Sequence, residues 1–195
     1  MAVDASMVKD LRTKTGAGVM ACKAALVESN GDVEKAVEVL RKKGIEAAES
    51  KAGRKLVEGR IGSYIHFGDR LGVLLEVGCE SDFVAKTPEF QELLKDLCMH
   101  IAASNPKWLS REDVPEDVLG KEREVYAAQF ANKPENVVGK IVEGKLASFF
   151  KESCLLEQPY VKDQDTNVGD YIKQYIGKLG ENIQVRRFAR FAVGE

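Results

Sequence analysis

Over residues 1–45, apolar side chains recur every three to four positions, a period typical of amphipathic helices. The turn sequences that separate three such stretches are TGAG at 15–18 and Asn30-Gly31. Asp32 is placed to cap the third helix, and Gly44 is placed to end it. We therefore predict a three-helix module over residues 1–45, followed by a linker or helical extension over residues 46–57.

From residue 58 the apolar positions change to a period of two, which is typical of β-strands. Residues 61–67 and 71–79 follow this pattern on either side of Gly68-Asp69, which predicts a hairpin. The helical patterns that follow run from Pro88 to near Asn105 and over 116–131, 135–153 and 168–179. Residues 183–188 are placed to add a third antiparallel strand. We predict an α+β core over residues 58–195, with helices and a small antiparallel sheet of about three strands.

The charges are close to balanced, with 29 Lys and Arg against 31 Asp and Glu in 195 residues. This argues against a partner bound mainly through phosphates, because such binding needs a surplus of basic residues, although a local basic patch stays open. The four cysteines form no CxxC pair, which indicates neither a zinc site nor a disulfide scaffold. The N-terminal sequence lacks the apolar core of a signal peptide, and no apolar run suits a membrane span. We expect a soluble, cytoplasmic protein that binds no membrane.

The sequence offers little enzyme chemistry. The motif GAGVMA at 16–21 matches the dinucleotide-binding pattern GxGxxA, but that pattern needs a preceding buried strand, and residues 9–14 are polar with a helical period. His66, on a predicted strand, and His100, in a predicted helix, have no metal-binding context. Asp82, at a strand-to-helix junction, is interpreted as a helix cap. We predict no cofactor, no metal and no catalytic residues, so the sequence supports an enzyme less well than a protein that binds another macromolecule.

Two features favour interaction with another macromolecule. Phe83 lies at a loop-like junction, where it either packs back into the core, the commoner case, or points outward as an anchor. The run RRFARF at 186–191 could stack on RNA and neutralise it. One alternative is therefore an RNA- or ribosome-associated binding protein that uses this C-terminal strand. Another is a chaperone-like protein that binds through Val19, Met20 and Phe83.

Three stretches together resemble one family. They are TGAGVMACKAAL at 15–26, LEVGCESDFVA at 75–85, and GENI at 180–183 leading to Arg186-Arg187-Phe188. In this order they are similar to the elongation factor Ts family, the guanine-nucleotide exchange factors of elongation factor Tu. The resemblance spans nearly the whole chain. It implies a ubiquitin-associated-like three-helix module and an α+β dimerisation core.

The resemblance also implies a non-covalent function, the release of GDP from elongation factor Tu, which allows GTP to be loaded. The Asp-Phe pair of the second stretch would face the partner's nucleotide domain, with the aromatic ring near switch II, where it disturbs the Mg²⁺ site. The three-helix module would contact the same domain from another side. The partner-binding residues carried over by position are Asp82, Phe83, Val84, Arg12, Val19, Met20 and Lys23.

The resemblance further implies an oligomeric state. Long members of the family carry a core of two related subdomains, and residues 58–195 show no second copy of the hairpin-plus-helix pattern. We therefore expect the short form, in which two chains supply the two halves. This predicts a homodimer that binds two molecules of elongation factor Tu in a 2:2 complex and makes no direct contact with nucleic acid.

Overall fold

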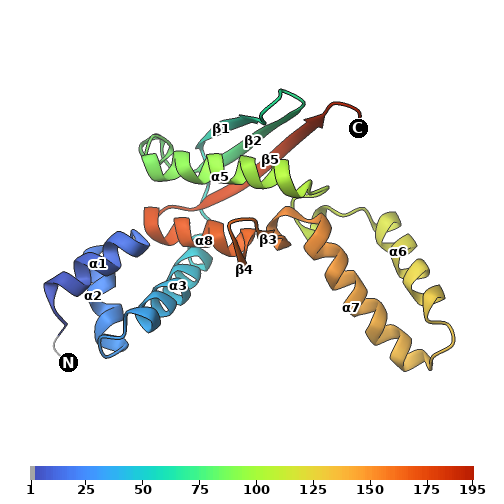
Figure 1. The fold of residues 1–195 in the computed structure, drawn as a ribbon, viewed down its shortest axis with the longest axis horizontal. Coiled ribbons are helices and arrows are strands. Elements are labelled where there is room, and N and C mark those ends of the chain that lie inside the picture. Colours follow the sequence, from blue (N-terminus) through green and yellow to red (C-terminus); the bar gives the residue numbers. More distant parts are fainter. Residues whose placement is uncertain (1–2) are drawn as a thin grey trace. The chain divides into compact units, whose positions relative to one another are not determined.

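The structure is a computed structural model that describes residues 3–195. It combines helices with small β-sheets, which confirms the predicted α+β class (Figure 1). The α-helices are α1 (Ala5–Thr15), α2 (Val19–Glu28), α3 (Val33–Glu49), α4 (Asp82–Ala85), α5 (Pro88–Ser104), α6 (Glu116–Gln129), α7 (Glu135–Ser153) and α8 (Val168–Leu179). The strands are β1 (Glu58–Ile65), β2 (Leu71–Cys79), β3 (Pro159–Tyr160), β4 (Asp163–Asn167) and β5 (Ile183–Ala192). Short 3-10 helices are η1 (Arg111–Asp113) and η2 (Leu155–Glu157).

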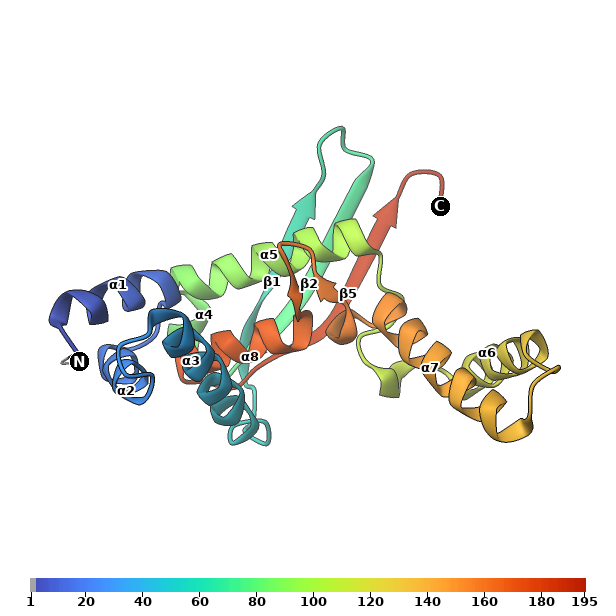
Figure 2. The same ribbon diagram turned by 60° about the horizontal axis from the view of Figure 1, so that its bottom comes forward.

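The main sheet has the strand order β1-β2-β5. β1 and β2 form the predicted hairpin, and β5 is the predicted third strand (Figure 2). Along β2, Val73, Leu75 and Val77 are buried, whereas Leu74 is exposed, because successive side chains of a strand point to opposite faces. β3 and β4 form a separate antiparallel pair. The sequence pattern does not predict this pair, because the two residues of β3 are too few to show a period.

The chain divides into two compact units. The first unit comprises the N-terminal part up to Ile61, Glu76–Leu94 and Asp170–Arg186, and the second comprises Gly62–Leu75, Lys95–Gly169 and Arg187–Glu195. All partner-binding residues named by the resemblance lie in the first unit. The boundaries expected from the sequence, with a module over 1–45, a linker or helical extension over 46–57 and a core over 58–195, stay predictions.

In the first unit, α1, α2 and α3 form the predicted three helices around a small core. Its buried residues are Leu11, Cys22, Ala25, Leu26 and Ala36. Asp4 caps α1 by accepting a hydrogen bond from the Ser6 backbone N at 3.4 Å, and Asp32 caps α3 by accepting one from the Lys35 N at 3.1 Å. Gly16 ends α1 with a φ of 69°, a conformation that favours glycine. The turn between α1 and α2 is thus a helix-to-helix corner.

The predicted end of the third helix at Gly44 is wrong. α3 continues through Gly44 to Glu49, so residues 46–49 of the predicted linker or helical extension are helical. Gly44 lies against Gly177 of α8, where a Cβ added to Gly177 would be 2.9 Å from the Cα of Gly44. The absence of a side chain therefore allows two helices to approach closely, which is a different role from ending a helix.

In the second unit, α6 and α7 form a helical hairpin (Figures 1 and 2). Their bounds agree with the predicted helices at 116–131 and 135–153 to within two residues. The buried residues of this region are Val114, Leu119, Val142, Leu146 and Cys154. His66 follows the last residue of β1 and so lies in the hairpin turn, which corrects the prediction that it lies on a strand.

Candidate functional site

Phe83 is 81% exposed, although it lies between strand β2 and helix α5. It is the second residue of the single-turn helix α4. Ser81 begins that turn, since its Oγ accepts a hydrogen bond from the Val84 N at 3.4 Å. Thr87 begins α5 in the same way, accepting from the Phe90 N at 3.2 Å. The sequence left two orientations open for Phe83, and the structure shows the outward one.

The neighbours of Phe83 differ in their exposure. Val84 is half-buried and Ala85 is buried, so α4 presents Phe83 on its outer side. Asp82 forms an ion pair with Lys86, with 2.5 Å between Oδ2 and Nζ. The hydrogen bond from Lys86 lowers the pKa of Asp82 below its ordinary value. Asp82 is therefore ionised at neutral pH and adds a negative charge beside the exposed ring.

The prediction that Asp82 caps a helix is wrong. Ser81 is the N-cap residue of α4, and Asp82 is the first residue within the helix. A carboxylate in the first turn of a helix still interacts favourably with the backbone N–H groups there. Asp82 and Phe83 are thus neighbours on a short turn whose backbone is held by a different residue.

Three of the other predicted contact residues, Arg12, Val19 and Lys23, line a groove between α1 and α2. The groove has a volume of about 340 Å³ and is lined by Val3, Ala5, Val8, Lys9, Arg12, Val19 and Lys23. The lining thus combines apolar side chains, mainly valines, with three basic side chains from Lys9, Arg12 and Lys23. Met20 does not line the groove, but its side chain is 75% exposed on the first turn of α2. The structure therefore brings Arg12, Val19 and Lys23 together at one groove. Met20 follows Val19 in α2 and is exposed outside that groove.

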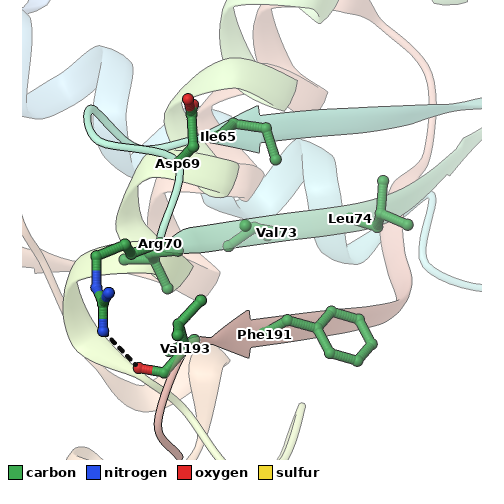
Figure 3. Close-up of a pocket in the computed structure, with 10 residues that line it drawn as sticks. Ile65, Asp69, Arg70, Val73, Leu74, Phe191 and Val193 are labelled. Carbon is green, nitrogen blue, oxygen red and sulfur yellow. Dashed lines mark hydrogen bonds between the residues drawn. The ribbon is translucent and has the colours of Figure 1, made fainter.

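The second unit has an exposed apolar surface that the sequence analysis did not identify. It includes Ile65 of β1, Leu74 of β2 and Phe191 of β5, all exposed (Figure 3). These side chains line a hollow of about 460 Å³. At its end, Arg70 Nη2 donates a hydrogen bond to the Val193 carbonyl at 3.5 Å. We call Ile65, Leu74 and Phe191 the outer sheet face. Strand alternation could have indicated this face, since Leu74 follows Val73 in an apolar strand.

The C-terminal arginines make contacts within the chain. Arg186 Nη2 donates to the Leu56 carbonyl at 3.2 Å. The side chain of Arg190 is only 13% exposed, and its Nη1 lies 2.6 Å from the carboxylate of Glu195. Arg190 Nε also donates to the Ala102 carbonyl at 3.3 Å. These guanidinium groups therefore already have partners within the protein.

His100 and the four cysteines are buried. His100 is fully buried, with its Nε2 donating to Gln158 Oε1 at 2.9 Å and its Nδ1 accepting from the Val161 N at 3.3 Å. All four cysteines are buried and free, and burial raises the pKa of Cys98 and Cys154 to about 11. These two thiols stay protonated at neutral pH, which makes them poor nucleophiles.

The described residues hold no assembled metal site. Within residues 3–195, no three His, Cys, Asp or Glu side chains are placed to bind one metal ion. Over the same residues, the helices are too short or too polar to span a lipid bilayer. The glycine-rich turn at 16–18 follows α1, so the preceding strand that a dinucleotide site requires is replaced by a helix.

Comparison with known proteins assigns the chain to a family. The family model for elongation factor TS matches residues 2–195. Elongation factor Ts of Caldanaerobacter subterraneus subsp. tengcongensis is 56% identical over 195 residues, covering 99% of this chain and 98% of the relative. Elongation factor Ts of Pseudothermotoga lettingae is 57% identical over 197 residues, covering all of both chains. That of Thermosipho melanesiensis is 55% identical, covering 99% of this chain and 100% of the relative. The chain therefore belongs to the elongation factor Ts family, the nucleotide exchange factors of elongation factor Tu.

Proposed function

We propose that this chain releases GDP from elongation factor Tu by inserting Phe83 near switch II of the partner, which disturbs the Mg²⁺ site. The exposure of Phe83 on a capped, single-turn helix supports this proposal most directly. Aromatic side chains are enriched among the residues that anchor protein–protein interfaces. Asp82 and Val84 flank the ring and contact the same region of the partner. The reaction is non-covalent, and this chain supplies only binding energy.

The groove between α1 and α2 provides a second contact. Its valines suit an apolar side chain of the partner, and Lys9, Arg12 and Lys23 suit acidic residues around it. Met20 adds exposed apolar surface. We therefore propose that this groove binds an acidic, amphipathic surface of the partner's nucleotide domain.

The energetics require more than one contact. A ten-thousandfold acceleration of release, taken as an illustration, needs roughly 5.5 kcal/mol of differential binding between the nucleotide-free and GDP-bound partner. Burial of one Phe side chain contributes about 1.5–3 kcal/mol. Phe83 alone is therefore insufficient. The rest comes from loss of the Mg²⁺ ligands and from the contact made by α1 and α2.

The outer sheet face supports the proposed homodimer. Ile65, Leu74 and Phe191 are large apolar residues that are exposed on neighbouring strands. Contiguous exposed apolar residues are typical of interaction surfaces. A two-fold axis would place the same surface of each chain against the other, as in most homodimers. We propose that two chains associate through this face and bind two molecules of elongation factor Tu in the cytoplasm.

The alternative of an RNA-binding protein has less support. Arg186 and Arg190 are engaged by carbonyl groups and by Glu195, so they would have to exchange these contacts for phosphates. The net charge of −2 provides no compensating basic surplus. We therefore propose a protein partner and no direct contact with nucleic acid.

The proposal is tested by stopped-flow measurement of fluorescent GDP release from elongation factor Tu. Phe83→Ala should slow the stimulated release strongly. Phe67→Ala is a matched control, because Phe67 is also an exposed phenylalanine, 98% accessible in the β1–β2 turn. The control should release GDP at the rate of the unaltered chain. Unchanged release with Phe83→Ala would overturn the proposed role of Phe83.

A further inference from the structure

The turn that carries Phe83 is held by the segment that follows α8. Glu181 Oε2 accepts hydrogen bonds from the backbone N of Glu80 at 3.1 Å and of Ser81 at 2.9 Å. Glu181 Oε1 accepts a third from the Ser81 hydroxyl at 2.5 Å. One carboxylate thus binds three donors in the two residues that precede α4.

The contact is reciprocal. The carboxylate of Glu80 accepts a hydrogen bond from the backbone N of Asn182 at 2.6 Å. The Asn182 side chain is buried, and its Nδ2 donates to the carbonyls of Ala52 at 3.2 Å and Arg54 at 3.0 Å. Glu181 therefore binds the segment before α4, and Asn182 binds the segment after α3.

From this geometry we infer that Glu181 is a positioning residue for nucleotide exchange, which sets the orientation of Phe83 through Ser81. A helix of a single turn has little stability by itself, so its direction depends on its cap. The Ser81 hydroxyl has one proton, which it donates to Glu181, and this directs its lone pairs toward the Val84 N. Glu181 therefore orients the cap, and the cap orients the turn that bears Phe83. This inference rests on the proposed function of Phe83.

The test is a double-mutant cycle on the full chain with elongation factor Tu carrying fluorescent GDP. The maximal rate of release and the half-saturating concentration are measured for Glu181→Ala, Phe83→Ala and the double variant. Glu181→Ala should lower the maximal rate by about tenfold, because a lost hydrogen bond to a charged group is equivalent to about that factor. The half-saturating concentration should stay within about twofold of the unaltered value. In the double variant, Glu181→Ala should cause no loss beyond that of Phe83→Ala.

Glu181→Gln is the conservative variant. Its amide oxygen can accept from both backbone N–H groups, and its NH₂ group can donate to Ser81 Oγ. It should restore the maximal rate to within about twofold of the unaltered chain. Glu157→Ala is the control, because Glu157 is also a half-buried carboxylate with a hydrogen-bonding partner, Arg111. This control should exchange nucleotide normally.

The inference would be overturned if Glu181→Ala lowered the maximal rate of GDP release by the same factor with and without the Phe83 ring. It would also be overturned if Glu181→Ala released GDP at the rate of the unaltered chain. If Phe83→Ala alone were fully active, the proposed role of Phe83 would fail whatever Glu181→Ala did, so the two failures are distinguishable. Thermal unfolding checks that each variant is folded at the assay temperature. If Glu181→Ala is unfolded at that temperature, Ser81→Ala replaces it in the double-mutant cycle. Ser81→Ala should then also lower the maximal rate, with no further loss of rate when it is combined with Phe83→Ala.

Discussion

Gly177 of α8 faces Gly44 of α3 so closely that a Cβ on Gly177 would lie 2.9 Å from the Cα of Gly44. Real Cβ atoms hardly ever approach a backbone atom this closely, so α3 or α8 would have to move. The two glycines therefore set the distance between the three-helix region and the helix that precedes Glu181. Both parts belong to the first unit, which also carries Phe83.

Gly177→Ala should destabilise the protein. The added methyl group meets rigid backbone, so its overpacking cost should lie in the upper part of the range of about 1–3 kcal/mol and exceed the roughly 1 kcal/mol that Ala gains over Gly in a helix. Gly144→Ala is the control, because Gly144 lies in α7 with open space around it. That variant should be more stable by about 0.5–1 kcal/mol. Urea unfolding measures both, and a stabilised Gly177→Ala would contradict the close approach.

Asp82→Ala and Ser81→Ala should differ in their effect on folding. Ser81 caps α4, so its loss should lower the free energy of unfolding by about 1 kcal/mol. Asp82 pairs with Lys86 at the surface, and its replacement should leave the thermal midpoint nearly unchanged while slowing GDP release. A large drop in the midpoint for Asp82→Ala would instead indicate that this residue is needed for folding.

The buried His100 should make stability depend on pH. Burial lowers the pKa of His100 below its ordinary value of 6.5, partly offset by the hydrogen bond with Gln158. Below that ordinary value the unfolded chain binds a proton that the folded chain does not, so the free energy of unfolding falls as pH is lowered from about 7 toward 5. Urea unfolding across this range measures the slope. In His100→Gln this part of the slope should disappear, and an unchanged slope would exclude His100 as its cause.

The proposed dimer is tested by light scattering at micromolar concentration. We expect twice the chain mass of 21.5 kDa. Phe191→Asp should give the single-chain mass, because it places a charge on the outer sheet face. Val125→Asp, at another exposed apolar residue in α6, should remain dimeric. A single-chain mass for the unaltered protein would contradict the dimer.

The sequence predicted most helices because their signals are local. α5 begins at Pro88, as the sequence predicts, and α7 and α8 follow uninterrupted helical patterns. The error at Gly44 has a physical cause. A glycine that ends a helix and one that admits a neighbouring helix look alike in sequence, and the neighbour, Gly177, is distant along the chain.

The site was harder to predict, because exposure depends on tertiary contacts. The pattern around Phe83 allowed both a buried and an exposed ring, and only the contacts of Ser81 and Ala85 decide between them. Arg12, Val19 and Lys23 were named through the family resemblance, whereas their common groove results from the packing of α1 against α2. The hydrogen bonds of Glu181 could not be predicted, since they join residues about a hundred positions apart.

The most direct test of the account is the affinity of Phe83→Ala for elongation factor Tu in its nucleotide-free and GDP-bound states. An exchange factor must bind the nucleotide-free state more tightly, and the ratio of the two affinities equals its effect on GDP binding. We predict that Phe83→Ala weakens binding to the nucleotide-free state more than to the GDP-bound state, so that the ratio falls. Equal weakening of both affinities would contradict it, because Phe83 would then contribute only uniform binding.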